Sequence, residues 1–193
     1  MKENEIREFA KENFIPIVRP NTGKLLIEKV KEINPSQILE IGTAIGYSGI
    51  LMLENSRAKL TTLEKDEKMK NIALKNFEKE GFNDRVTLIF GDAIDFIEKE
   101  NQKFDFIFLD GPKGQYPKYL PHLLKMLNVG GMIFCDNVLF GGLVLSEGIV
   151  EKKHRTIVNN LRLFLKMVKD NDKIESELID LEDGICLITK NAD

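Results

Sequence analysis

Cysteine, histidine and long apolar runs are scarce in this chain of 193 residues. Its two cysteines, Cys135 and Cys186, each lie in an apolar run, and two such isolated residues make neither a disulfide framework nor a zinc motif. No apolar run approaches the roughly 20 residues that a membrane span needs, and the start of the chain is charged where a signal peptide would be apolar. These absences predict buried free thiols and a cytoplasmic protein.

A strong excess of charge of one sign is also missing. The formal net charge is -3 and the pI is near 5.6, so no overall field attracts phosphate, and any contact with nucleic acid must be local. The length and the 42% hydrophobic content suffice for one substantial core but are short for two. We therefore expect a single domain over residues 1–193, with 1–34 as an N-terminal helical extension and 35–193 as the core.

Short β-rich runs alternate with helical patterns through most of the chain. The expected strands cover residues 38–41, 59–63, 86–90, 104–109 and 132–135, and the expected helices between them cover 47–55, 66–80, 92–100 and 116–128. Before them we expect a helix near residues 3–13, an extended segment at 14–20, and a second helix that Asn21 or Thr22 caps and that ends near Ile33. This alternation predicts βαβ units and a parallel sheet covered on both faces.

The last third of the chain departs from that alternation. A long helix is expected from about Ile149 to Lys169, with apolar residues on one face and basic residues on the opposite face. The simpler interpretation of the basic face is a solvated surface. Two strand-like runs, 173–180 and 184–189, are joined by the turn signal Asp183-Gly184 and predict an antiparallel hairpin at the edge of the sheet. The expected fold is α/β, with a Rossmann-like, doubly wound, mostly parallel sheet of seven strands.

Several expected strand ends carry residues that suit a nucleotide-like cofactor. Gly42 and Gly46 follow a strand and open a helix, where backbone N–H groups can approach a ligand closely. Their Gly-x-x-x-Gly spacing is not the Gly-x-Gly-x-x-Gly dinucleotide fingerprint, which disfavours NAD and FAD. Glu64 stands where an acidic side chain accepts hydrogen bonds from ribose hydroxyls. Asp92 could equally meet an adenine amino group or cap the next helix.

Two further strand ends carry hard oxygen ligands. The carboxylates of Asp110 and Asp136 and the amide oxygen of Asn137 suit Mg²⁺, and no histidine lies nearby to favour zinc. Lys113 could reach the same space as a base or an electrostatic partner, although a lysine in such a turn is usually only solvated. Acidic groups at five consecutive strand ends would repel one another unless a cation were shared among them: Glu40, Glu64, Asp92, Asp110 and Asp136.

Three segments carry a resemblance to a known family: Ile38-Leu-Glu-Ile-Gly-Thr-Ala-Ile-Gly-Tyr-Ser48, Asp110-Gly-Pro-Lys-Gly-Gln-Tyr116 and Asp136-Asn-Val-Leu-Phe-Gly-Gly-Leu-Val144. Together they resemble the class I S-adenosylmethionine-dependent methyltransferases. Within that class they are similar to the small divalent-metal-dependent O-methyltransferases, which include the catechol and caffeoyl-CoA enzymes. The likeness is closest to the bacterial tRNA 5-hydroxyuridine methyltransferases, which methylate a wobble-position hydroxyl to give 5-methoxyuridine.

This resemblance implies a role for each matching residue. It places the methionine part of S-adenosylmethionine against Glu40, Gly42, Tyr47 and Ser48, the ribose against Glu64, and the adenine against Asp92 and Ala93. It makes Asp110, Asp136 and Asn137 the ligands of Mg²⁺ or another divalent cation, with Asp110 also bordering the cofactor and taking part in catalysis. Lys113 would take the proton of the substrate hydroxyl or stabilise the resulting oxyanion. The resemblance also implies a homodimer.

Two acceptor classes stay open, because the 5-hydroxy and 4-keto oxygens of hydroxyuridine can chelate a cation as the two oxygens of a catechol do. For tRNA, phosphate contacts are expected from a local basic patch: Arg19, Lys152, Lys153, Arg155 and Arg162. For a small phenolic substrate that patch would be idle surface. A non-catalytic cofactor-binding module and an NAD-dependent oxidoreductase are rival classes. The Asp110, Lys113, Asp136 and Asn137 set disfavours the first, and the missing dinucleotide fingerprint disfavours the second.

Overall fold

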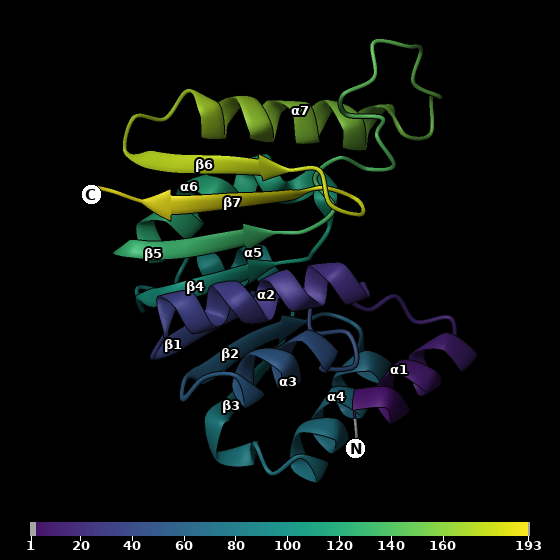
Figure 1. The fold of residues 1–193 in the computed structure, drawn as a ribbon, viewed down its shortest axis with the longest axis vertical. Helices are drawn as coiled ribbons and strands as arrows, with labels where there is room; N and C mark the ends of the chain where they lie inside the picture. The colour runs from purple at the N-terminus through teal and green to yellow at the C-terminus, as the bar shows by residue number, and fades with distance from the viewer. Residues whose placement is uncertain (1–2, 193) are drawn as a thin grey trace.

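A sheet of seven strands runs through the protein in the order β3-β2-β1-β4-β5-β7-β6 (Figure 1), in a computed structural model that describes residues 3–192. Strands β1 to β5 pair in parallel, whereas β7 runs antiparallel to both β5 and β6. The α/β fold with an antiparallel C-terminal hairpin is therefore confirmed. The strands are β1 (Gln37–Ile41), β2 (Lys59–Glu64), β3 (Val86–Phe90), β4 (Phe104–Leu109), β5 (Leu127–Cys135), β6 (Ile174–Ile179) and β7 (Ile185–Lys190).

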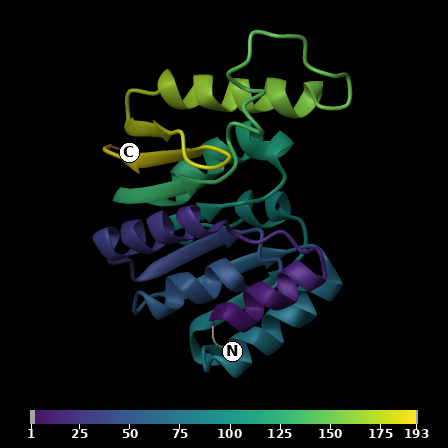
Figure 2. The same cartoon turned by 45° about the vertical axis from the view of Figure 1, so that its right-hand side comes forward.

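Helices cover both faces of this sheet. One face packs against α1 (Glu3–Glu12), α2 (Pro20–Ile33), α3 (Tyr47–Glu54) and α4 (Glu67–Lys79), and the other against α5 (Ala93–Ile97), α6 (Tyr116–Met126) and α7 (Arg155–Lys169). Figure 2 shows α1 alongside α4, where Lys79 Nζ lies 3.4 Å from Glu5 Oε2. Within residues 3–192, no helix combines the length and apolar character that crossing a membrane would require.

The alternation of side chains along β4 creates the two cores. Phe106 and Phe108 point to the α1–α4 face, whereas Ile107 and Leu109 point to the α5–α7 face, and all four are fully buried. This follows from the two-residue period of a strand whose two faces are both covered. Both cysteines are free and buried, as predicted, and Cys135 lies opposite Cys186 in the β5–β7 pairing.

Three predicted boundaries were wrong by more than two residues. Strand β5 begins at Leu127 and not at residue 132, because Gly130, at a φ of 79°, and Gly131, which packs against the Asp105 carbonyl, carry the chain through an irregular start. Helix α7 begins at Arg155, six residues after Ile149, whose side chain is 97% exposed. Helix α5 ends at Ile97 and not near residue 100. Ile149 is apolar but does not reach the core, so it does not begin α7.

The N-terminus of α2 is capped from a distant part of the chain. Neither Asn21 nor Thr22 is the N-cap, because the helix begins at Pro20, and Arg19 at the cap position offers no side-chain bond. Instead Glu182, in the turn between β6 and β7, accepts hydrogen bonds from the Asn21 amide (3.2 Å), the Thr22 amide (2.9 Å) and the Thr22 hydroxyl (2.6 Å). This contact links the hairpin to α2 across 160 residues of sequence.

We predict that Glu182→Ala lowers the free energy of unfolding by about 1 kcal/mol, because the substitution removes an N-terminal cap. Burial opposes ionisation of Glu182, but its bonds to Thr22 and Asn21 outweigh burial and lower its pKa below the ordinary 4.5. The stabilisation should therefore be complete above that value and fade as the pH falls below it. Urea unfolding at a series of pH values measures it, with Glu175→Ala on exposed β6 as the control; equal effects of the two substitutions would contradict the cap.

Candidate active site

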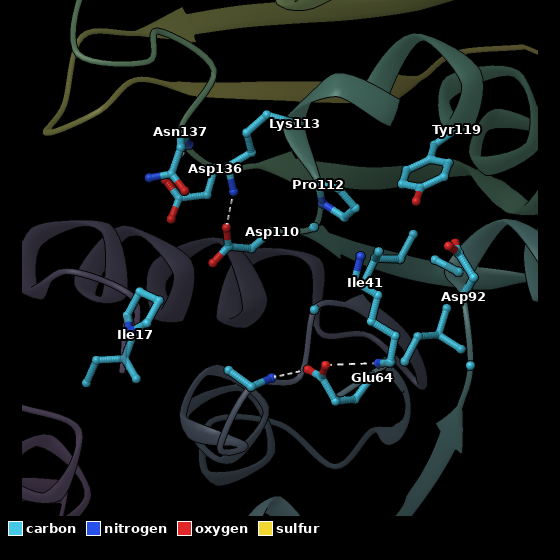
Figure 3. A pocket seen from close by; sticks show the side chains of 18 of the residues that line it. Ile17, Ile41, Glu64, Asp92, Asp110, Pro112, Lys113, Tyr119, Asp136 and Asn137 are labelled. Atoms are coloured by element: carbon cyan, nitrogen blue, oxygen red, sulfur yellow. Dashed lines mark hydrogen bonds and ion pairs between the residues drawn. The ribbon is translucent and has the colours of Figure 1, made fainter. Parts of the chain in front are cut away.

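A cavity of about 480 Å³ opens at the edge of the sheet where the parallel strands end. Residues from the ends of β1, β2, β3, β4 and β5 line it, together with the segment that precedes α2. The predicted site residues that the cavity brings together are Arg19, Gly42, Glu64, Asp92, Ala93, Asp110, Lys113, Asp136 and Asn137. Figure 3 shows Asp110, Lys113, Asp136 and Asn137 gathered on one side of it, with Glu64 and Asp92 further along.

Backbone hydrogen bonds continue between neighbouring strands just past their ends. The Asp110 amide donates to the Ile41 carbonyl (3.0 Å), and the Asp136 amide donates to the Leu109 carbonyl (3.0 Å). Gly42 adopts a φ of 100°, and a Cβ there would stand 2.3 Å from the Asp110 carbonyl oxygen, so only glycine allows this approach. The ladder therefore fixes the backbone of both aspartates relative to the glycine loop.

Asp110 and Asp136 present two carboxylates in the cavity, with the Asn137 side chain next to them (Figure 3). Lys113 Nζ lies 2.5 Å from Asp110 Oδ1 and supplies the positive charge beside that carboxylate. Within residues 3–192, no three His, Cys, Asp or Glu side chains cluster as a metal site, so a cation here would rely on two carboxylates and one amide oxygen. That donor set suits Mg²⁺.

Asp136 is only 4% exposed, and its environment favours the protonated acid. Burial, followed by repulsion from Asp110, raises its pKa to about 7, although the Asn137 amide donates to Asp136 Oδ1 at 2.7 Å and Lys113 also lowers it. Asn137 holds a left-handed φ of 57°, which asparagine tolerates better than most residues. A divalent cation between the aspartates would offset both the burial and the repulsion, so the residues present fit a metal.

Glu64 and Asp92 line the cavity with oxygens that already accept backbone hydrogen bonds. Glu64 accepts from the amides of Ala44 (2.8 Å), Lys65 (2.9 Å) and Asp66 (2.8 Å), which ties β2 to the glycine loop. Asp92 caps α5 by accepting from the Ile94 amide at 3.2 Å. The capping interpretation of Asp92 is thus confirmed, and its place in the cavity wall leaves room for a ligand contact as well.

Glu40 does not reach the cavity. It is fully buried behind the glycine loop, where it accepts hydrogen bonds from the hydroxyls of Ser48 (2.5 Å) and Thr62 (2.6 Å). Burial raises its pKa to about 7 against the effect of these two bonds. Tyr47 and Ser48 line only a small side cavity of about 20 Å³, which the Pro16–Val18 segment covers. Three residues predicted to bind the cofactor therefore do not line the main cavity: Glu40, Tyr47 and Ser48.

Several residues that line the cavity were not predicted from the sequence. Pro16 and Ile17 form one wall because the segment before α2 folds over the glycine loop. Tyr119 forms part of another, and burial raises its pKa to about 12. Tyr119 lies three residues after Tyr116 on α6, a spacing that places both on one helix face. That spacing is equally typical of two core residues, so it does not by itself predict a place at the cavity.

The predicted basic patch is only partly available for a ligand. Arg162 donates to the carbonyls of Leu143, Val144 and Ser146, which holds the loop before α7. Arg155 donates to the Val150 carbonyl, and Lys153 pairs with Glu151 at 3.0 Å. Lys152 is exposed, and the exposed Arg19 lies at the cavity itself. Two of the five predicted cations therefore have a clear structural task.

The sequence profile of the O-methyltransferase family matches residues 3–191. The chain belongs to this family. It is 33% identical over 170 residues to a catechol O-methyltransferase of Niastella koreensis, covering 85% of this chain and 75% of the relative. A Bacillus cereus O-methyltransferase solved with S-adenosylhomocysteine (SAH) is 29% identical, with a TM-score of 0.86 and coverage of 97% of this chain and 90% of that one.

A further relative is the O-methyltransferase TomG of Streptomyces achromogenes, solved with S-adenosylmethionine (SAM). It is 25% identical, with a TM-score of 0.88, over 98% of this chain and 89% of that one. Membership of the O-methyltransferases confirms the predicted enzyme class and the class I methyltransferase fold. It rules against the alternatives of a non-catalytic module and an NAD-dependent oxidoreductase.

We predict that the metal-free O-methyltransferase loses stability as the pH rises from about 4 towards 8. Asp136 and Glu40 bind a proton more tightly when folded, since their pKa values rise from 3.8 and 4.5 to about 7. Added Mg²⁺ should raise the Tm most above about pH 7, where Asp136 is ionised. Thermal melts measure both effects. The matched variant Asp136→Asn should flatten the slope and abolish the Mg²⁺ effect, and an unchanged Mg²⁺ effect in this variant would contradict the assignment.

Proposed function

We propose that this O-methyltransferase transfers the methyl group of S-adenosylmethionine to a hydroxyl oxygen that has a second oxygen beside it, with a divalent cation as helper. The observation that carries this proposal is the pair of carboxylates, Asp110 and Asp136, next to Lys113 at the cofactor cavity. The relatives solved with SAM and SAH support the cofactor.

For the cofactor, we assign the predicted residues by their place around the cavity. Gly42 lines the cavity where we place the methionine part, with Glu40, Tyr47 and Ser48 supporting the loop from behind. Glu64 has its carboxylate at the cavity for the ribose hydroxyls, and Asp92 and Ala93 border the position of the adenine. Asp110 faces both the cofactor and the metal side of the cavity.

For the cation, we assign Asp110, Asp136 and Asn137 as ligands. When bound, Mg²⁺ would act as a Lewis acid that lowers the pKa of the acceptor hydroxyl. Lys113 lies beside Asp110, where its ammonium group can stabilise the oxyanion that remains; only as the neutral amine, after it has given up its own proton, could it take the hydroxyl proton. The chain's own contribution to the transfer is to hold that oxyanion in line with the methyl group and the sulfur.

We favour 5-hydroxyuridine at the tRNA wobble position as the acceptor, on the resemblance of Asp110-Gly-Pro-Lys-Gly-Gln-Tyr116 and the segment from Asp136 to Val144. Arg19 lines the cavity and Lys152 is exposed, so we assign phosphate contacts first to these two cations, with Lys153, Arg155 and Arg162 as the remaining candidates. A small catechol-like phenol is the second candidate, and the 33% identical catechol O-methyltransferase favours it. We also infer a homodimer from the family resemblance.

The experiment that tests this function is methyl transfer from labelled SAM to tRNA that carries 5-hydroxyuridine and, in parallel, to a panel of catechols. We expect label in tRNA that EDTA abolishes and Mg²⁺ restores. Arg19→Ala should weaken tRNA transfer, and its effect should shrink at high salt, because phosphate contacts release counterions. Label in catechols alone would favour the second candidate, and transfer that EDTA leaves intact would contradict the metal.

We predict that Lys113→Met lowers kcat by about 10²- to 10⁴-fold, the range typical of a lost proton-transfer group, because it removes the cation next to Asp110. SAM affinity should change little, as Lys113 is assigned to the acceptor side. Isothermal titration with SAH and single-turnover kinetics separate the two effects. Lys118→Met is the matched control, since its exposed ammonium pairs with Glu98. An equal loss of SAH affinity and rate in Lys113→Met would contradict the assigned role.

A further inference from the structure

Tyr116 lies fully buried below the two candidate metal-ligand carboxylates. Its hydroxyl lies 3.0 Å from the Leu109 carbonyl oxygen and 3.2 Å from the Asp136 carbonyl oxygen, so one phenolic proton serves both acceptors. The Leu109 carbonyl belongs to the peptide group that leads into Asp110. One side chain thus contacts the backbone at the base of both carboxylates.

These bonds close a small network at the ends of β4 and β5. The Leu109 carbonyl also accepts from the Asp136 amide at 3.0 Å. After this bond, β4 leads into the turn before α6 and β5 leads into the loop before α7. A rotation of the Leu109–Asp110 peptide group or of the Asp136–Asn137 peptide group would turn the neighbouring Cα atom. The aspartate side chain on that atom would then move away from the other carboxylate. Both rotations would break a bond to Tyr116. The hydroxyl therefore restricts the separation of the two carboxylates.

Helix α7 holds the Tyr116 ring in place from the other side. The ring meets Phe164 edge-on, with centroids 5.5 Å apart and an interplanar angle of 71°. Asn160, one turn earlier on α7, donates to the Gly114 carbonyl at 2.8 Å and anchors the turn that carries Lys113. Neither residue lines the cavity, so this support would act through Tyr116 and the turn.

We propose that Tyr116 is a positioning residue for the divalent cation, and that its hydroxyl sets the spacing of the Asp110 and Asp136 carboxylates through their backbone. This inference rests on the proposed metal site. It assigns a role to a side chain that touches neither the cation nor the substrates. Groups that orient metal ligands in this way commonly change metal affinity by about 10- to 100-fold when removed.

The test is a titration of the cofactor-free protein with Mn²⁺, in which the electron paramagnetic resonance signal of the free ion measures how much Mn²⁺ is unbound. Tyr116→Phe removes one oxygen and keeps the ring, and we expect it to raise the Kd for Mn²⁺ about tenfold. Asp105→Ala is the stability control. Asp105 is the second residue of β4 and lies at the end of that strand away from the cavity, where it accepts hydrogen bonds from Ser36, Gln37 and Asn128. It should lower the Tm and keep the wild-type Kd.

An unchanged Kd in Tyr116→Phe would overturn the inference, as would an equal rise in Asp105→Ala, which would mark a general effect of lost stability. Phe164→Leu keeps the hydroxyl but loosens the ring, and should raise the Kd to a smaller extent. If Tyr116→Phe does not fold, a wild-type Kd in Phe164→Leu would overturn the inference. Wild-type protein that binds no Mn²⁺ would contradict the proposed metal site itself, and the inference with it.

Discussion

The hydrogen-bond ladder between parallel strands is the constraint on which the rest of the site depends. It runs just past the strand ends, from the Asp110 amide to Ile41 and from the Asp136 amide to Leu109. Because every strand from β1 to β5 points the same way, the residues that follow them must meet at one edge. The fold thereby brings side chains that are distant in the sequence to one cavity.

Each carboxylate at this edge is stabilised in a different way. Glu64 accepts three backbone amides, and Asp92 caps a helix. Glu40 is buried among hydroxyl donors. Asp110 pairs with Lys113, whereas Asp136 has one amide donor on its carboxylate, and burial raises its pKa to about 7. Of these carboxylates, Asp136 therefore has the least compensated negative charge, and a cation bound there would be stabilised most.

The sequence predicted the elements that follow a simple period and the residues that end them. Strands β3 and β4 were predicted with the correct limits, because each is a short, mostly apolar run that polar or turn residues bound on both sides. The cap of α2 by Glu182 and the wall formed by Ile17 could not be predicted, since both depend on contacts between distant segments. Glu40 was expected at the cavity as a strand-end residue, but β1 ends one residue later, at Ile41. The Glu40 carboxylate instead accepts hydrogen bonds from Ser48 and Thr62 and does not line the cavity.

We propose that Asp110, Asp136 and Asn137 together hold one divalent cation at the cavity. Crystals grown with Mn²⁺ and S-adenosylhomocysteine, measured above and below the manganese absorption edge, test it most directly. We expect a single anomalous peak bounded by the two carboxylates and the Asn137 amide oxygen, with Lys113 close by. A map with no peak there, while the cofactor is bound, would contradict it.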